Sequence, residues 1–364
     1  MSITPDQRDP SRPTAAEAAQ RARIGIRRDA LRLSATIDDF FRPDDARLDD
    51  RTRLTLATVL GAIIGAIEGD IRRHAARVLG GWAEDGAADA LIAAQGQALD
   101  RLLASRVLRN RSLMEELIGR VRQDLLAEAL PTAVSEPDQP SVVVRLTDVG
   151  DGVVATAASA LLAAQSRRRA ANDLGVAAGT ELSADNHHRL VWWTAAAIRE
   201  SAGDNALVDR AIEEAALRSL AAHDEGDRLE SLATRLAIAV DARPSEVPTL
   251  LVDILGDQTL VLFIAVLARA IGLDYTQMRR IVLDPDGSHL WLALRAVQLD
   301  RAAIARIGLS LADADPVRDV EAFADRLDEI AATEPEVAQA ALAPLAAHPD
   351  LRRALADLAD VPFA

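Results

Sequence analysis

The chain has 364 residues, of which 49% are hydrophobic and 27% are charged, a composition that indicates a globular protein with a substantial core. It contains no Cys, and all 41 basic residues are Arg, which excludes disulfides, thiolate chemistry, a Walker-type phosphate loop and a Schiff-base lysine. The net charge of −15 falls entirely in residues 131–364, and this balance argues against a nucleic-acid-binding protein, which needs a basic face.

The N-terminal segment and the apolar stretches predict where the protein resides. Residues 1–14 contain three prolines and no apolar run, so we predict a disordered tail rather than a secretion signal. The longest uncharged stretches are Leu54–Ile67, Gly152–Ser166 and Gln258–Ala268. Each is shorter than the roughly 18–20 residues that a membrane span needs, so we expect buried core helices. We therefore predict a cytoplasmic protein that does not contact a membrane.

The first third of the chain predicts a helical bundle over residues 15–130. Ala and Leu dominate, and apolar residues recur at intervals of three and four, as they do in amphipathic helices. The expected helices are Ala16–Phe41, Arg51–Leu79, Ala87–Ala104 and Ser112–Leu130. Pro43 follows the first helix and Gly80 the second, as helix ends require.

A proline-rich segment, residues 131–141, is the strongest candidate for a domain boundary. Val142–Leu146, directly after it, is the only run with a strand-like composition. A lone strand cannot satisfy its backbone hydrogen bonds, so we expect a helix start or a loop there. An Ala-rich helix is expected next, over Val153–Ala171.

Residues 142–364 predict a long array of helices joined by short turns. Asp274, Asp300 and Asp315 are placed to cap successive helices, and Pro316 suits the first position of a helix. Consecutive helices on short turns are typical of stacked helix pairs. We therefore predict an all-α fold in which antiparallel helix pairs form a HEAT-like array or a degenerate α-solenoid, preceded by the N-terminal bundle.

The most unusual stretch, DNHHRLVWW, begins at Asp185 and holds two of the six His and two of the four Trp. A helical zinc site needs His at i and i+4, whereas His187 and His188 are adjacent and point about 100° apart. His188 and Trp192 are at i and i+4 and can stack. We expect one of Trp192 and Trp193 to fill the core and both His to lie near a helix start; the alternative is a ligand or partner surface that includes Arg189.

Two groups of arginines are candidates for an anion site. The run RRR, which contains Arg168 and Arg169, ends a predicted helix, where cations complement the negative helix terminus. The alternative is a phosphate site, because guanidinium groups bind phosphate in a bidentate manner. Arg279 and Arg280 offer the same alternative. A ligand-binding protein would bring these four residues and Arg295 together around one pocket.

The acidic turns resemble calcium loops only at their start. Asp284, Asp286 and Gly287 place glycine at the fourth position of such a loop rather than the sixth, and Arg295 stands where a bidentate Glu is needed. The acidic residues 313–321 fail the same test. We interpret both as turns and helix starts and predict no metal and no cofactor. Asp284 and Asp286 remain candidates for a ligand or partner surface.

The C-terminal half resembles a known family. The residues between His187 and Glu329 include HHRLVWWTAAAIRE and LFIAVLARAIGLDYTQMRRIVLDPDGSHLWLALRAVQLD. Over residues 150–330 this pattern resembles alphaproteobacterial proteins that share domain of unknown function 2336. The resemblance implies a bacterial, helical and HEAT-like protein without an established activity, and it carries no catalytic residues.

These observations lead to three functional hypotheses. The first is a non-catalytic scaffold or regulatory adaptor that binds a protein partner or a second copy of itself, because helical arrays present extended surfaces. An acidic half favours a basic partner. The alternative is a sensor that holds a small anionic, nucleotide-like ligand between Arg side chains. A hydrolase is the second alternative; because no G-x-S-x-G motif is present, an enzyme is less favoured than a non-catalytic protein.

Overall fold

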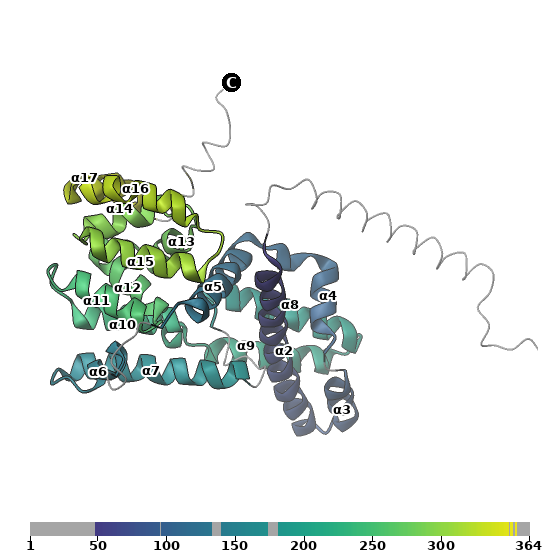
Figure 1. Cartoon of the computed structure of the whole chain (residues 1–364). Helices are drawn as coiled ribbons and strands as arrows, with labels where there is room; N and C mark the ends of the chain where they lie inside the picture. The colour runs from purple at the N-terminus through teal and green to yellow at the C-terminus, as the bar shows by residue number, and fades with distance from the viewer. Residues whose placement is uncertain are drawn as a thin grey trace, which may run out of the picture. The chain divides into compact units, whose positions relative to one another are not determined.

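The computed structural model describes residues 48–94, 96–132, 140–173, 181–348, 350, 351 and 354 (Figure 1). The chain divides into two compact units, Met1–Arg53 and Leu54–Ala364, and all features below belong to the second unit unless stated otherwise. The predicted tail 1–14, the predicted helix 16–41 and residues 133–139 of the predicted linker lie outside the described residues.

The described residues confirm the all-α class, since they form helices joined by short turns and contain no strand. The α-helices are α2 (Asp50–Gly81), α3 (Asp85–Ala93), α4 (Ala98–Ser105), α5 (Arg111–Ala129), α6 (Val142–Thr147), α7 (Gly152–Asp173), α8 (Ala184–Ala202), α9 (Ala206–Ala222), α10 (Leu229–Val240), α11 (Val247–Gly256), α12 (Leu260–Ile271), α13 (Tyr275–Leu283), α14 (Ser288–Ala296), α15 (Arg301–Ala314), α16 (Val320–Ala332) and α17 (Pro335–Leu342). Short 3₁₀ turns are η2 (Val107–Arg109), η3 (Glu225–Asp227) and η4 (Ala343–Ala346).

Helix starts follow the capping residues in most places. The carboxylates of Asp274 and Asp300 accept hydrogen bonds from backbone N–H groups of the first turns of α13 and α15, as predicted. The expected start at Asp315 is wrong, because Asp319 caps α16 instead and accepts from the backbone N–H of Ala322 at 2.9 Å. Asp315 accepts from the backbone N–H of Val317 and shapes the turn before that helix.

The strand-like run after the proline-rich segment is helical. Ser141 caps α6, and its hydroxyl accepts from the N–H of Val144 at 3.4 Å. The N–H of Val142 donates to the Asp257 carboxylate at 2.5 Å, so a side chain from α11's end also satisfies this helix start. The expectation of a helix start or loop at Val142–Leu146 is therefore confirmed.

The long helix α2 carries a buried ion pair inside its apolar stripe. Arg72 Nε donates to Glu68 Oε1 at 2.8 Å, and both side chains are almost completely buried. Arg72 also donates to the Leu91 carbonyl at 2.8 Å, and the Gly96 N–H donates to Glu68 at 3.1 Å. These bonds fix α2 against α3 and the turn that follows α3.

Among the described helices, α2 alone has the length and apolar composition that a membrane span requires. The helices α12 and α13 meet that criterion only when taken together, and they are bent by 115° where they join. The absence of membrane contact and the cytoplasmic location stay predictions.

The helices sort into two groups that do not follow the chain order. The helices α6, α7 and α10–α17 share one apolar core with the end of α5, and Figure 1 shows them layered above α7. The helices α8 and α9 pack on each other and contact the N-terminal helices, α8 through α4. The sequence placed α8 and α9 in the C-terminal array, on the far side of a boundary at residues 131–141. In the structure, helices from both sides of that segment form one compact unit.

Large aromatic side chains fill the core of the C-terminal group. Phe263 is fully buried and Trp291 is 6% exposed, which confirms the expectation for both. The rings of Trp291 and Phe323 lie 4.5 Å apart between α14 and α16. A HEAT-like repeat of these helix pairs stays a prediction.

Candidate functional site

The first turn of α8 contains the two adjacent His, as predicted, and separates them into different environments. His187 points inward and is 4% exposed, whereas His188 is exposed. Trp192 Nε1 donates to His188 Nε2 at 3.2 Å, and the two rings meet edge to face. Trp192 and Trp193 are half-buried, so neither is a core side chain like Trp291.

Arg168 and Arg279, two of the predicted anion ligands, are buried and already neutralised by carboxylates. Arg168 forms ion pairs with Asp124 and, at 3.3 Å, with Glu181. Arg279 pairs with Glu230 at 3.2 Å. Since these charges are satisfied within the fold, they do not offer a site to an external anion.

These pairs belong to a larger buried cluster, which we call the ionic core. It contains four arginines and four carboxylates from five segments, namely Glu116, Arg120, Asp124, Arg168, Glu181, Arg228, Glu230 and Arg279. Burial alone would raise the pKa of Glu230, but the guanidinium groups of Arg228 and Arg279 outweigh it and hold that pKa below its usual value. The ionic core therefore contains matched charges and acts in the packing of helices.

Glu116 connects the ionic core to the start of α8. Its carboxylate accepts from the backbone N–H and the hydroxyl of Ser183, both at 2.7 Å, and from the Asn186 amide at 2.6 Å. Arg228 adds an ion pair at 3.0 Å. The neighbouring Arg189 donates to Asn186 at 3.1 Å. These bonds hold the side chains of Ser183, Asn186 and Arg189 in place at the start of α8.

The remaining predicted site residues lie apart from one another. Arg169 is exposed beside Arg168, and Arg280 forms an ion pair with Glu115 on α5. Arg295 donates to the carbonyls of Thr333 and Leu299, at 2.9 Å and 2.6 Å, and so holds α14 to the end of α16. The five arginines do not converge on one pocket, which is a correction to that expectation.

Asp284 and Asp286 form the predicted turn. The backbone N–H of Asp286 donates to the Asp284 carboxylate at 3.2 Å, and Ser288 donates its hydroxyl to Asp286. In the part of the chain that the structure describes, no group of three or more His, Asp or Glu side chains is arranged to hold a metal ion.

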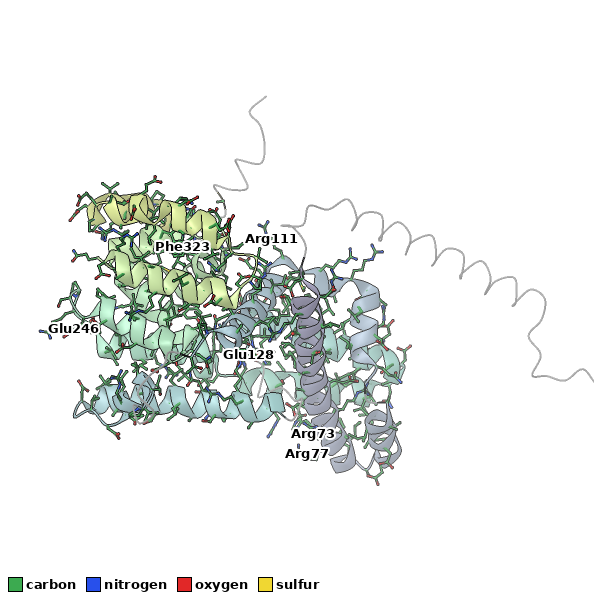
Figure 2. All side chains as sticks on the ribbon, in the orientation of Figure 1. Arg73, Arg77, Arg111, Glu128, Glu246 and Phe323 are labelled. Carbon is green, nitrogen blue, oxygen red and sulfur yellow. The ribbon has the colours of Figure 1, made fainter. Side chains whose placement is uncertain are left out.

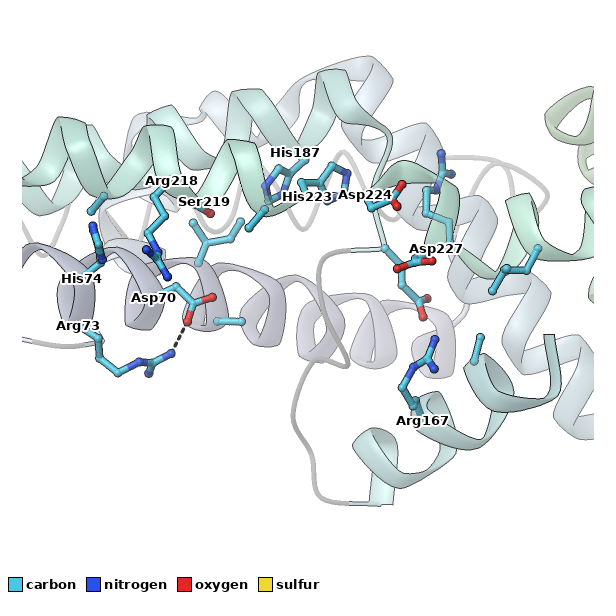
Figure 3. Close-up of a pocket in the computed structure, with 18 of the residues that line it drawn as sticks. Asp70, Arg73, His74, Arg167, His187, Arg218, Ser219, His223, Asp224 and Asp227 are labelled. Carbon is cyan, nitrogen blue, oxygen red and sulfur yellow. Dashed lines mark hydrogen bonds and ion pairs between the residues drawn. The ribbon is translucent and has the colours of Figure 1, made fainter. Parts of the chain in front are cut away.

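A cleft of about 810 Å³ lies where the two groups of helices meet (Figure 3). Its walls come from α2, α7, α9 and η3, together with the start of α8. The charged and hydrogen-bonding residues that line it are Asp70, Arg73, His74, Arg77, Arg167, Glu181, His187, Arg218, Ser219, His223, Asp224, Asp227 and Arg228.

One end of the cleft is cationic. Asp70, Arg73, His74 and Arg77 follow one face of α2 because they are spaced at i, i+3, i+4 and i+7, and Arg73 and Arg77 project together from that helix (Figure 2). Arg73 is paired with Asp70. Arg77, and Arg218 from α9, form no ion pair with any described residue.

His74 lies near Arg77 and Arg218, and their charges affect its pKa. It is half-buried, and its Nδ1 atom is buried without a hydrogen-bond partner among the described residues. Burial lowers the pKa of His74, the positive charges of Arg218 and Arg77 lower it further, and the carboxylate of Glu214 opposes them. Arg77 and Arg218 therefore both act on this imidazole at the same end of the cleft.

Two stacked imidazoles form part of the cleft wall near its middle. The rings of His187 and His223 lie 4.0 Å apart and nearly parallel. His223 Nε2 is 3.1 Å from the Leu182 carbonyl, and His187 has a main-chain hydrogen bond with Ser219. Burial and the neighbouring His223 lower the pKa of His187 to about 4, so this ring is neutral at pH 7.

The other end of the cleft carries charges of both signs. Asp224 caps η3, and its carboxylate accepts from the Gly226 N–H at 2.7 Å. Asp227 and Arg167 line this end from η3 and α7 (Figure 3), and neither forms an ion pair with a described residue. This end therefore presents a carboxylate acceptor and a guanidinium donor that are not joined to each other.

The sequence contained one local signal for this cleft. The charged residues of α2 recur at helical spacing beside its apolar stripe, which places them on one face at its edge. No local pattern could bring Arg218 or Arg167 next to that face, because they come from helices more than 80 residues further along the chain.

Comparison of the chain with protein-family models, with curated proteins and with solved structures finds no match. The resemblance to domain of unknown function 2336 stays a prediction.

Proposed function

We propose that this protein is a non-catalytic regulatory protein that binds a small anionic ligand in the cleft between α2, α7 and α9. The observation that supports this most directly is the pair of arginines at the cationic end, Arg77 and Arg218, which have no carboxylate partner among the described residues. Both guanidinium groups lower the pKa of the same imidazole, that of His74, so they lie near each other at one end of the cleft.

Electrostatics gives the reason for an anion at this end. Burial is the main cause of the lowered pKa of His74, and the positive charges of Arg218 and Arg77 lower it further through like-charge repulsion. An anion that accepts hydrogen bonds from both arginines would relieve it, and guanidinium groups match phosphate oxygens in geometry. The arginines of the ionic core differ, because each already has a carboxylate within 4 Å.

The test uses inorganic phosphate as the probe and isothermal titration calorimetry of the full chain. We expect measurable binding that weakens about tenfold in R77Q and in R218Q, as the loss of a charge-assisted hydrogen bond of about 1.5 kcal/mol requires. R326Q on α16 is the matched control, since Arg326 is exposed and lies outside the cleft. Equal binding by all four proteins, or no binding, would contradict the proposal.

A scaffold that binds a protein partner is the second candidate, and exposed apolar side chains favour it. Leu309 on α15, Val317 in the turn between α15 and α16, and Val337 on α17 are each more than half exposed. Exposed apolar side chains mark an interaction surface where they form one patch. Light scattering after size exclusion tests whether that surface joins two copies, because L309D should dissociate such a dimer.

A further inference from the structure

The size of the cleft, together with the chemistry of its two ends, indicates what kind of anion it holds. A volume of about 810 Å³ falls within the roughly 300–1,000 Å³ that is typical of sites for organic ligands. The cationic end at Arg77 and Arg218 occupies only one part of it. A free phosphate would leave the middle and the far end of the cleft without a binding partner.

The two ends of the cleft follow one another along α9 and the turn after it. From Arg218 to Ala222 the chain advances along α9 by roughly 6 Å, at 1.5 Å per residue, and Asp227 lies beyond the end of that helix. Along this path the walls contain small side chains, which leave room for a ring; they are Ala160, Ala163, Ala164, Ala215 and Ala222. The imidazole rings of His187 and His223 lie between the ends.

At the far end, Asp227 and Arg167 are the charged lining residues whose side chains form no ion pair or hydrogen bond with another described residue, whereas Glu181, Asp224 and Arg228 have partners. The Asp227 carboxylate accepts hydrogen bonds only, and the Arg167 guanidinium donates only. A ligand group with an adjacent donor and acceptor can therefore bond to both (Figure 3). An amino-bearing nucleobase has this pattern, since adenine presents its N6 amino group as a donor next to the ring acceptor N7.

We infer that the cleft binds a nucleotide with an amino-bearing base, with its phosphate at Arg77 and Arg218, its base edge at Asp227 and Arg167, and its sugar beside the alanines. This inference rests on the proposed function, because it assigns the anionic end of the ligand to the same cationic end. Beyond the proposed function, the inference identifies the end of the ligand opposite the phosphate as an amino-bearing base.

The experiment compares three probes by isothermal titration calorimetry of the full chain: adenosine 5′-monophosphate, inosine 5′-monophosphate and inorganic phosphate. We expect the adenosine nucleotide to bind at least about tenfold more tightly than phosphate. The inosine nucleotide has a carbonyl oxygen in place of the amino group, and this acceptor faces the Asp227 carboxylate. It should therefore bind about tenfold more weakly than the adenosine nucleotide, within the range for losing one base contact.

Two variants measure separately how much each end of the cleft contributes to binding. D227A should remove the preference for the adenosine over the inosine nucleotide and leave phosphate binding unchanged. R77Q should weaken all three probes alike. D325A on α16 is the matched control, because Asp325 is an exposed carboxylate outside the cleft.

The outcomes separate this inference from the proposed function. If phosphate and both nucleotides bind equally, the far end contributes nothing and the inference fails, while the anion site stands. If the adenosine nucleotide binds better than phosphate but the two nucleotides are not distinguished, the assignment of the base edge to Asp227 fails. If none of the three binds, both proposals fail together.

Discussion

The buried ion pair of α2 gives the sharpest prediction about stability. We expect E68L to destabilise the fold strongly, because it leaves the Arg72 guanidinium buried with no counter-charge. The side chains of Arg72 and Glu68 are only 1% and 2% exposed, so water cannot replace the lost carboxylate. The Gly96 N–H loses its acceptor in the same variant.

The magnitude follows from these contacts. Removing one partner of a buried ion pair costs about 3–5 kcal/mol, since the remaining charge is uncompensated. The double variant E68L/R72M removes both charges and leaves the Leu91 carbonyl and the Gly96 N–H unsatisfied, at about 1–3 kcal/mol each if neither finds water. Because water reaches the turn around Gly96, we expect the double variant to be about 2 kcal/mol more stable than E68L.

The assay is urea unfolding of the wild type, E68L, R72M and E68L/R72M, followed by circular dichroism at 222 nm. The four free energies of unfolding form a double-mutant cycle, whose coupling term isolates the pair. A double variant that is less stable than E68L, or two single effects that simply add, would refute the argument that an uncompensated charge causes the loss.

Three further predictions concern other parts of the fold. The pKa of His187 is about 4 in the folded protein and near 6.5 in the unfolded chain. The contribution of this group to the free energy of unfolding is therefore full above pH 6.5, and up to roughly 3 kcal/mol is lost as the pH falls to 4. H187Q should lose this part of the pH dependence of the urea midpoint. G308A should lower the free energy of unfolding by about 1–3 kcal/mol, since its Cβ would overlap the Phe323 ring, and a higher melting temperature would contradict this. An anion bound beside His74 should raise its lowered pKa, so phosphate binding should be accompanied by proton uptake at this imidazole; calorimetry in buffers of different ionisation enthalpy measures the protons exchanged, and the difference between the wild type and H74Q gives the His74 contribution.

The fold class could be predicted because its causes are local. Alanine and leucine at helical spacing specify helices without reference to distant residues, and Asp274 and Asp300 cap them within one turn. The contact between His188 and Trp192 was predictable for the same reason, as i and i+4 are neighbours on any helix. The start of α16 was missed because two acids, Asp315 and Asp319, compete within four residues.

The functional site could not be predicted because its causes are distant in the sequence. The consecutive arginines were predicted as candidates for an anion site. In the structure Arg168 pairs with Asp124, 44 residues away in the sequence, and Arg279 pairs with Glu230, 49 residues away. Whether an arginine is neutralised depends on such encounters, which no local pattern encodes. Arg77 and Arg218 had no distinctive neighbours in the sequence, and only the packing of α9 beside α2 brings them together.

The ionic core has a consequence for how the protein is made. Its members on α5, Glu116, Arg120 and Asp124, leave the ribosome well before Arg228, the last of their own partners. At about 5–20 residues per second, roughly 5–20 s pass between the synthesis of α5 and that of Arg228. During that interval the charges of α5 must stay hydrated, because burying them unpaired is too unfavourable. The N-terminal helices therefore cannot complete their packing as an early cotranslational unit, and nascent chains shorter than about 230 residues should remain sensitive to protease along α5.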